Sequence, residues 1–185
     1  SAILEIGMEA AVRSVRPGML ETEVLAEAEY AMRKAGSEGS SFRMQVLRHD
    51  RQLLVHPYAG AYELRNNEPV VIHLGATVEG YGSKMCRTVF LGNVSDETKH
   101  VYDVIRKAQE IAVEALKPGV LAGEIYDRVF EYIESQGFGK AWLEHIGYGV
   151  GIRQSEFYPI IAKGSTVPIE ENMVVDLLLP TIYRP

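Results

Sequence analysis

The stretch "AVRSVRPGMLETEVLAEAEYAMRKAG", residues 11–36, returns in outline as "AVEALKPGVLAGEIYDRVFEYIESQG", residues 112–137. When the two are aligned without a gap, the alanine and valine that open each copy, the Pro-Gly pair in the middle and the closing glycine all coincide. Each copy combines the end of one helix, a Pro-Gly stop and a second amphipathic helix closed by glycine. The repeat therefore predicts two pairs of helices, one in each half of the chain.

A buried-strand pattern follows each copy of the repeat. "NEPVVIHLG" (67–75) and "ENMVVDLLL" (171–179) are both rich in Val, Ile and Leu. Two copies of helix, helix and strand predict one duplicated α+β domain, with halves of about 1–93 and 94–185 and a cleft between them. We expect helices at about 2–16, 21–35, 96–116 and 122–136, strands near 42–47, 52–56, 69–78, 82–91 and 172–179, a hairpin turn at 80–82, and irregular chain over 138–168.

Composition narrows the class of protein. The chain has 185 residues, of which 46% are hydrophobic and 24% charged, as is usual for a globular protein. A net charge of -6 provides no basic surface, so we expect no nucleic-acid partner. Apolar runs are short and the start lacks a secretion pattern, so we expect no membrane partner and a cytoplasmic location. The lone cysteine, Cys86, excludes an internal disulfide and a zinc site of several thiolates.

Two polar residues interrupt strand patterns in "HLGATVEGYGSKMCRT" (73–88), and a glycine-rich stretch, "HIGYGVGIRQSEFYP" (145–159), lies in the second half. Together with the two helix pairs, these motifs resemble the catalytic domain of the creatinase, prolidase and methionine aminopeptidase family, peptidase family M24. The resemblance covers nearly the whole chain. It implies the pita-bread fold, an α+β architecture with pseudo-two-fold halves around a central cleft, here with truncation expected at both ends.

The resemblance also shows which positions hold metal ligands in the family, and this chain has other residues at those positions. Metallopeptidases of the family hold two divalent metals with two Asp, one His and two Glu. Here His73 and Lys84 stand at the two Asp positions, and Tyr148 stands at the His position. A dinuclear site needs several hard oxygen ligands, and an ammonium group repels a cation. We therefore expect no metal and no other cofactor.

One histidine of the family pattern is kept. His56, in "LLVHPYAG", corresponds to a histidine that faces the substrate, and its spacing to His73 matches that of creatinase, which also lacks the metal ligands. An imidazole with an ordinary pKa of ~6.5 can move a proton at neutral pH. The resemblance thus favours a metal-independent, creatinase-like hydrolase of a C–N bond (amide, amidine or ring) in a small polar substrate. The partner expected is a small-molecule or short-peptide substrate. The site residues expected on this reading are His56 as the catalytic residue and His73, Lys84, Tyr148 and Glu156 as substrate-binding residues.

Other readings remain open at this point. His73 could make a structural hydrogen bond to Tyr148 or Glu156, because a buried polar group needs a partner. Lys84 could form an ion pair with Asp176 or Glu156 that replaces the metals structurally. The whole protein could be an inactive peptidase-like module that binds a peptide or protein, or an Xaa-Pro dipeptidase or aminopeptidase that uses metals. Family members commonly dimerise, so we expect a homodimer.

Overall fold

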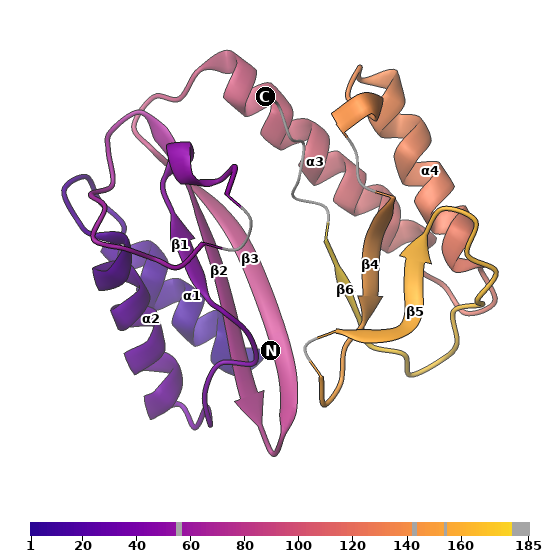
Figure 1. Ribbon diagram of the computed structural model, residues 1–185, viewed down its shortest axis with the longest axis horizontal. Coiled ribbons are helices and arrows are strands. Elements are labelled where there is room, and N and C mark those ends of the chain that lie inside the picture. The colour runs from indigo at the N-terminus through magenta and orange to yellow at the C-terminus, as the bar shows by residue number, and fades with distance from the viewer. Residues whose placement is uncertain (55–56, 142–143, 154, 179–185) are drawn as a thin grey trace. The chain divides into compact units, whose positions relative to one another are not determined.

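The computed structural model describes residues 1–54, 57–141, 144–153 and 155–178, and it is mixed α/β (Figure 1). The chain divides into two compact units. Unit 1 comprises Ser1–Ser95 and Ile152–Gln154, and unit 2 comprises Asp96–Gly151 and Ser155–Pro185. Among the helices of the described residues, none has both the length and the apolar character that crossing a membrane requires.

Unit 1 consists of two helices on one face of a three-stranded antiparallel sheet (Figure 1). The strands lie in the order β1, β2, β3, and a 3-10 helix at His49–Arg51 follows β1. The elements are α1 (Ala2–Ser14), α2 (Glu21–Lys34), β1 (Gln45–Leu47), β2 (Glu68–Val78) and β3 (Tyr81–Leu91).

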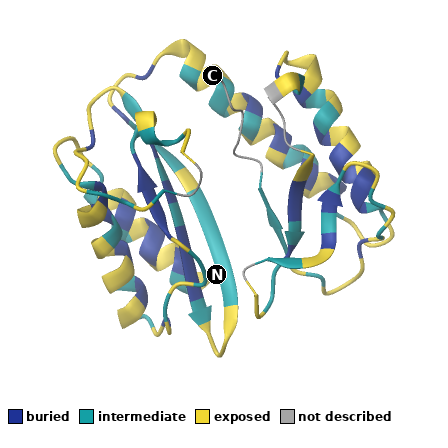
Figure 2. Ribbon diagram, in the orientation of Figure 1, coloured by how far each residue is buried: buried dark blue, intermediate teal, exposed yellow. Residues whose placement is uncertain are grey.

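The core of unit 1 follows from the two-residue period of β2. Val70, Ile72 and Leu74 have no exposed surface and share one apolar cluster with Leu4 of α1 and Val24 of α2. Figure 2 shows buried residues within β2 and in the two helices of unit 1. Burial of each large apolar side chain stabilises the fold by about 1.5–3 kcal/mol. The even-numbered residues of β2 therefore hold the helices to the sheet.

A two-residue turn joins β2 to β3. Glu79 and Gly80 have positive φ angles of 50° and 80°, and Val78 pairs directly with Tyr81. Positive φ at both central positions matches the twist of a tight hairpin. The predicted turn at 80–82 is therefore displaced, because Tyr81 and Gly82 already belong to β3.

Unit 2 has the same kinds of element in the same order, two helices and then three strands. Its antiparallel sheet has the order β5, β4, β6, and its core joins Ile125, Val129 and Ile133 of one helix to Ile146 and Ile161 of the sheet. The elements are α3 (Asp96–Ala115), α4 (Ala122–Ser135), a 3-10 helix (Gly139–Ala141), β4 (His145–Gly149), β5 (Glu156–Ala162) and β6 (Val175–Leu177).

All four predicted helices are confirmed. The predicted strand at 52–56 is wrong for residues 52–54, and the prediction of irregular chain over 138–168 is wrong where two strands form. Residues 52–54 form turns instead of a strand, because the backbone N–H groups of Gln52 and Leu54 donate to nearby carbonyls and not to a neighbouring strand. The rest of that predicted strand, 55–56, lies outside the described residues. The segment predicted as irregular contains β4 and β5. The glycine at position 147 does not look like a strand residue in the sequence. The structure requires it, because a Cβ at this position would lie 2.7 Å from the Asp176 carbonyl oxygen.

We predict that Ile72→Ala lowers the free energy of unfolding by about 2–5 kcal/mol, because it leaves a cavity in a fully buried site. Ile6→Ala is the matched control, because Ile6 in α1 is 46% exposed and its truncation should cost far less. Urea unfolding followed by circular dichroism measures both. Equal losses for the two variants would contradict this assignment of the core.

Candidate functional site

The face of the unit 1 sheet that points away from the helices carries polar side chains. Its register places Gln45, His73 and Cys86 side by side on β1, β2 and β3, and places Lys84 opposite Gly75. Residues directly opposite each other in a sheet share a face, and residues two apart on one strand do as well. His73 and Lys84 therefore lie on one face. We call Gln45, His73, Lys84 and Cys86 the polar face of unit 1.

Phe42 covers part of this polar face. Its ring centroid lies 4.3 Å from that of His73, and the Lys84 ammonium lies 5.8 Å from the same ring. Gly75 makes the approach possible, because a Cβ there would come within 2.5 Å of the Phe42 ring. Next to Phe42, the Ser41 hydroxyl donates to the Ser83 carbonyl at 3.1 Å and ties this segment to β3.

The electrostatics of the polar face oppose a bound cation. Lys84 stands where the resemblance expects an Asp. The residue is half-buried, and its ammonium lies 5.8 Å from the centroid of the Phe42 ring, a contact that favours a positive charge. His73, at the other Asp position, offers one nitrogen ligand in place of a charged oxygen. In the part of the chain that the structure describes, no three or more His, Cys, Asp or Glu side chains are grouped to hold a metal ion. The residues of this face do not fit a pair of divalent metals.

Residues 48–54 and 57–60, the described parts of the loop from Arg48 to Gly60, are hydrogen-bonded to the sheet of unit 1. Gln45 is buried, shares the face of His73, and donates from Nε2 to the Pro57 carbonyl at 2.9 Å. Gln52 donates to the carbonyl of Pro69 at 3.0 Å. The predicted catalytic residue, His56, lies outside the described residues, so its role remains a prediction.

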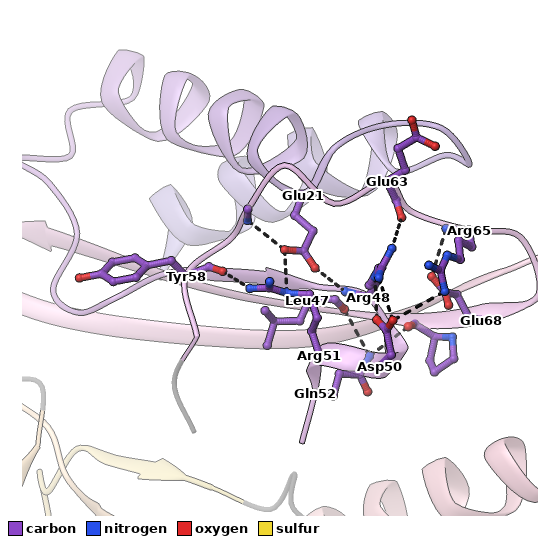
Figure 3. A network of polar contacts seen from close by, with 12 residues as sticks. Glu21, Leu47, Arg48, Asp50, Arg51, Gln52, Tyr58, Glu63, Arg65 and Glu68 are labelled. Carbon is purple, nitrogen blue, oxygen red and sulfur yellow. Dashed lines mark hydrogen bonds and ion pairs between the residues drawn. The ribbon is translucent and has the colours of Figure 1, made fainter. Parts of the chain in front are cut away.

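Charged side chains at the start of this loop contact one another (Figure 3). The Arg48 guanidinium donates to both carboxylate oxygens of Asp50, at 2.7 and 2.8 Å. The Arg48 hydrogen bond is the main reason that the pKa of the Asp50 carboxyl lies below its usual value. Asp50 is exposed, so the pair contributes little to the free energy of unfolding, although it orients Arg48.

The other predicted site residues belong to unit 2. Tyr148 on β4 is half-buried and lies directly opposite Asp176 on β6, so these two side chains share a face of that sheet. Glu156 begins β5 opposite Gly149, and a Cβ at Gly151 would lie 3.3 Å from its carboxylate. The structure thus brings His73 together with Lys84, and Tyr148 together with Asp176. The substrate-binding roles of these residues stay predictions.

Sequence reasoning missed Phe42, Gln45 and Glu21. Phe42 and Gln45 resemble ordinary strand residues, and nothing in their immediate sequence marks them. Glu21 did carry a signal, because the aligned position of the internal repeat is Ala122. The two copies of the repeat therefore differ in charge at the first position of the second helix.

We predict that Gly75→Ala lowers the free energy of unfolding by about 1–3 kcal/mol, because the added methyl group overpacks against Phe42. In the double variant Gly75→Ala/Phe42→Ala, the space vacated by the ring should accept the methyl group. The two changes together should then cost less than the sum of the single changes in urea unfolding. Strictly additive losses would show that Phe42 does not lie over Gly75.

Comparison with known proteins identifies the family. The model of metallopeptidase family M24 matches residues 1–185. The chain is 32% identical to the Xaa-Pro dipeptidase of Pyrococcus furiosus over 99% of its own length and 52% of the relative's. It is 34% identical to the Xaa-Pro dipeptidase of Lactobacillus delbrueckii subsp. lactis, over 98% of this chain and 48% of that protein. The chain thus spans about half the length of the curated relatives it matches.

Solved structures agree with these relatives. The prolidase from Pyrococcus furiosus superimposes with a TM-score of 0.89 at 32% identity, over 94% of this chain and 51% of that one. The X-Pro aminopeptidase from Thermotoga maritima superimposes with a TM-score of 0.85 at 34% identity, over 94% and 50% of the two chains. With the helix pairs, the sheets and the motifs of both units in agreement, the chain belongs to metallopeptidase family M24.

Proposed function

We propose that this protein is a peptidase-like hydrolase of short peptides with proline in the second position, and that it works without the paired metals of its relatives. The names of the relatives support this substrate class, since they are Xaa-Pro dipeptidases and an X-Pro aminopeptidase. They favour a peptide bond over the amidine or ring bond that a creatinase-like reading would allow. The substrate proposal therefore follows the relatives more closely than it follows creatinase.

The observation that carries the metal-free part of the proposal is Lys84 on the polar face of unit 1. Its ammonium and His73 occupy one face of the β2–β3 hairpin, at the positions where the family resemblance expects two carboxylates. A positive side chain there offers a counter-charge to an anionic group of the substrate instead of a ligand to a cation. We propose that Lys84 binds the carboxylate of the peptide, while His73 contacts the peptide beside it.

His56 is the proposed general acid and base. It takes a proton from a water molecule, the water oxygen bonds to the carbonyl carbon of the scissile peptide bond, and the proton passes to the leaving proline nitrogen as the C–N bond breaks. Tyr148 and Glu156 are proposed as further substrate contacts. All five assignments rest on the family pattern and on the chemistry of these residue types.

We also propose that the two units are copies of one α+β unit and together form a single pita-bread domain. Their backbone hydrogen bonds support this. Gly18 N–H donates to the Leu64 carbonyl at 2.9 Å, and Gly119 N–H donates to the Ile169 carbonyl at 2.8 Å. Each glycine follows the proline of one repeat and ties its helix pair to the strand region of its own unit. A homodimer and a cytoplasmic location remain predictions.

A second candidate function is peptide binding without turnover. Lys84 favours it, because a residue that excludes the metals also removes the chemistry by which metallopeptidases of the family activate water. The peptide would then be recognised and released intact.

We predict that the protein hydrolyses Ala-Pro at a rate that changes less than about twofold with EDTA or added Mn²⁺. His56→Ala should lower kcat by about 100-fold or more, because general acid and base catalysis contributes 10² to 10⁴. His49→Ala, an exposed histidine of the same loop, is the matched control and should leave the rate unchanged. Chromatography of released alanine and proline measures turnover.

The alternatives give different results in the same assay. Turnover that EDTA abolishes and Mn²⁺ restores would show an Xaa-Pro metallopeptidase. Saturable binding of Ala-Pro in calorimetry with no products after long incubation would show the binding module. If the protein neither hydrolyses nor binds Ala-Pro, the peptide proposal is wrong.

We further predict that Lys84→Met raises KM for Ala-Pro by about 10-fold or more, the usual range for losing a hydrogen bond to a charged group. The control experiment uses a different substrate with the same two proteins. Ala-prolinamide lacks the carboxylate, so Lys84→Met should leave its KM nearly unchanged. An equal rise in KM for both peptides would contradict a carboxylate-binding role for Lys84.

A further inference from the structure

Glu21 is a carboxylate with no exposed surface at the first position of α2. It accepts hydrogen bonds from the backbone N–H of Arg48 at 3.0 Å and of Gly60 at 2.9 Å (Figure 3). Arg51 Nε lies 3.2 Å from the same carboxylate, within ion-pair distance but without the alignment of a hydrogen bond. A buried charge is tolerated only with such partners. Burial of the Glu21 carboxylate therefore costs free energy of folding, which its hydrogen bonds and its ion pair offset.

The partners of Glu21 show what the carboxylate holds. Arg48 and Gly60 stand at the two ends of one loop, so a single side chain joins those ends. Arg51, inside the loop, donates to the Tyr58 carbonyl and stacks on the Tyr62 ring, with its guanidinium carbon 3.9 Å from the ring centroid. The described residues of the loop, 48–54 and 57–60, contain no β-strand. Side-chain contacts therefore take the place of a strand ladder in fixing this loop.

Unit 2 provides an internal comparison. α4 begins at Ala122, the position aligned with Glu21, and Ala122 is also fully buried. The backbone bonds at the two helix starts correspond: Glu21 N–H donates to the Tyr62 carbonyl at 3.1 Å, and Ala122 N–H donates to the Val167 carbonyl at 2.8 Å. The helix start is therefore built without a carboxylate in unit 2. A carboxylate is therefore not required to start the helix, and the hydrogen bonds that Glu21 accepts come from the two ends of the loop.

Pro57, in a described part of the loop, lies beside the polar face of unit 1. Gln45, which shares a face with His73, reaches the Pro57 carbonyl within the loop. The chain between the described parts of the loop carries His56. We propose that Glu21 is a positioning residue, whose carboxylate fixes residues 48–54 and 57–60, the two described parts of the loop on either side of His56 in the sequence. The catalytic part of this inference rests on the proposed function, and the structural part does not.

Hydrogen exchange measured by mass spectrometry tests the structural part. In Glu21→Gln, peptides covering residues 48–60 should exchange at least about tenfold faster than in the native protein, while peptides from α4 should be unchanged. Glu27→Gln, an exposed glutamate of the same helix, is the matched control and should exchange like the native protein. Arg51→Lys should loosen the same peptides, and it tests the proposal independently if Glu21→Gln does not fold.

Two results in the exchange experiment would overturn the proposal. One is native exchange of residues 48–60 in both Glu21→Gln and Arg51→Lys. The other is equal acceleration over α2 and the loop, because it would mean that Glu21 supports the helix and not the loop.

Kinetics with Ala-Pro test the positioning role. Glu21→Gln should lower kcat by about tenfold or more and change KM by less than about threefold, because the proposed acid and base is displaced while Lys84 remains. Native turnover in a variant whose loop is loosened would overturn the positioning role and leave the proposed function intact. Absence of turnover in the native protein would instead sink the proposed function, and the exchange result would still decide whether Glu21 holds the loop.

Discussion

The pairing of β2 with β3 is the constraint on which unit 1 depends. Both strands run for 11 residues, and every residue of β2 has a partner on β3. Because side chains alternate, one register places Ile72 and Leu74 against the helices and His73 and Lys84 on the opposite face. A slip of one residue would exchange these faces and bury the charged groups in the core. The tight turn at Glu79 and Gly80 prevents that slip.

The two faces of this sheet are stabilised by different physics. On the helix side, burial of many apolar side chains stabilises the packing of the helices on the sheet. On the polar face, the described residues of the loop, 48–54 and 57–60, contain no β-strand, and the apolar side chains of Leu53, Leu54 and Tyr58 are exposed. A few directional contacts hold it instead, from Glu21, Gln45 and Gln52. Such contacts position a loop with definite geometry, but each of them matters individually.

Family membership and site chemistry lead in different directions in this chain. A match to family M24 over residues 1–185 shows the fold and relatedness to peptidases. Fold alone does not decide chemistry, because function depends on the side chains that the fold presents. Lys84 and His73 share one face of the unit 1 sheet, at positions where the family resemblance expects carboxylates. The proposed substrate therefore follows the relatives, and the proposed mechanism follows these two side chains.

The amino-acid sequence by itself determined the four helices, the β2–β3 hairpin and the family, because these depend on local periodicity and on short motifs. It also identified His73 and Lys84 as unusual, because polar residues interrupt an apolar strand. Only the tertiary structure decided that Phe42 packs on Gly75 and that Glu21 binds the loop. Glu21 lies 27 and 39 residues from its two backbone donors, and no local pattern encodes a hydrogen bond between such distant groups.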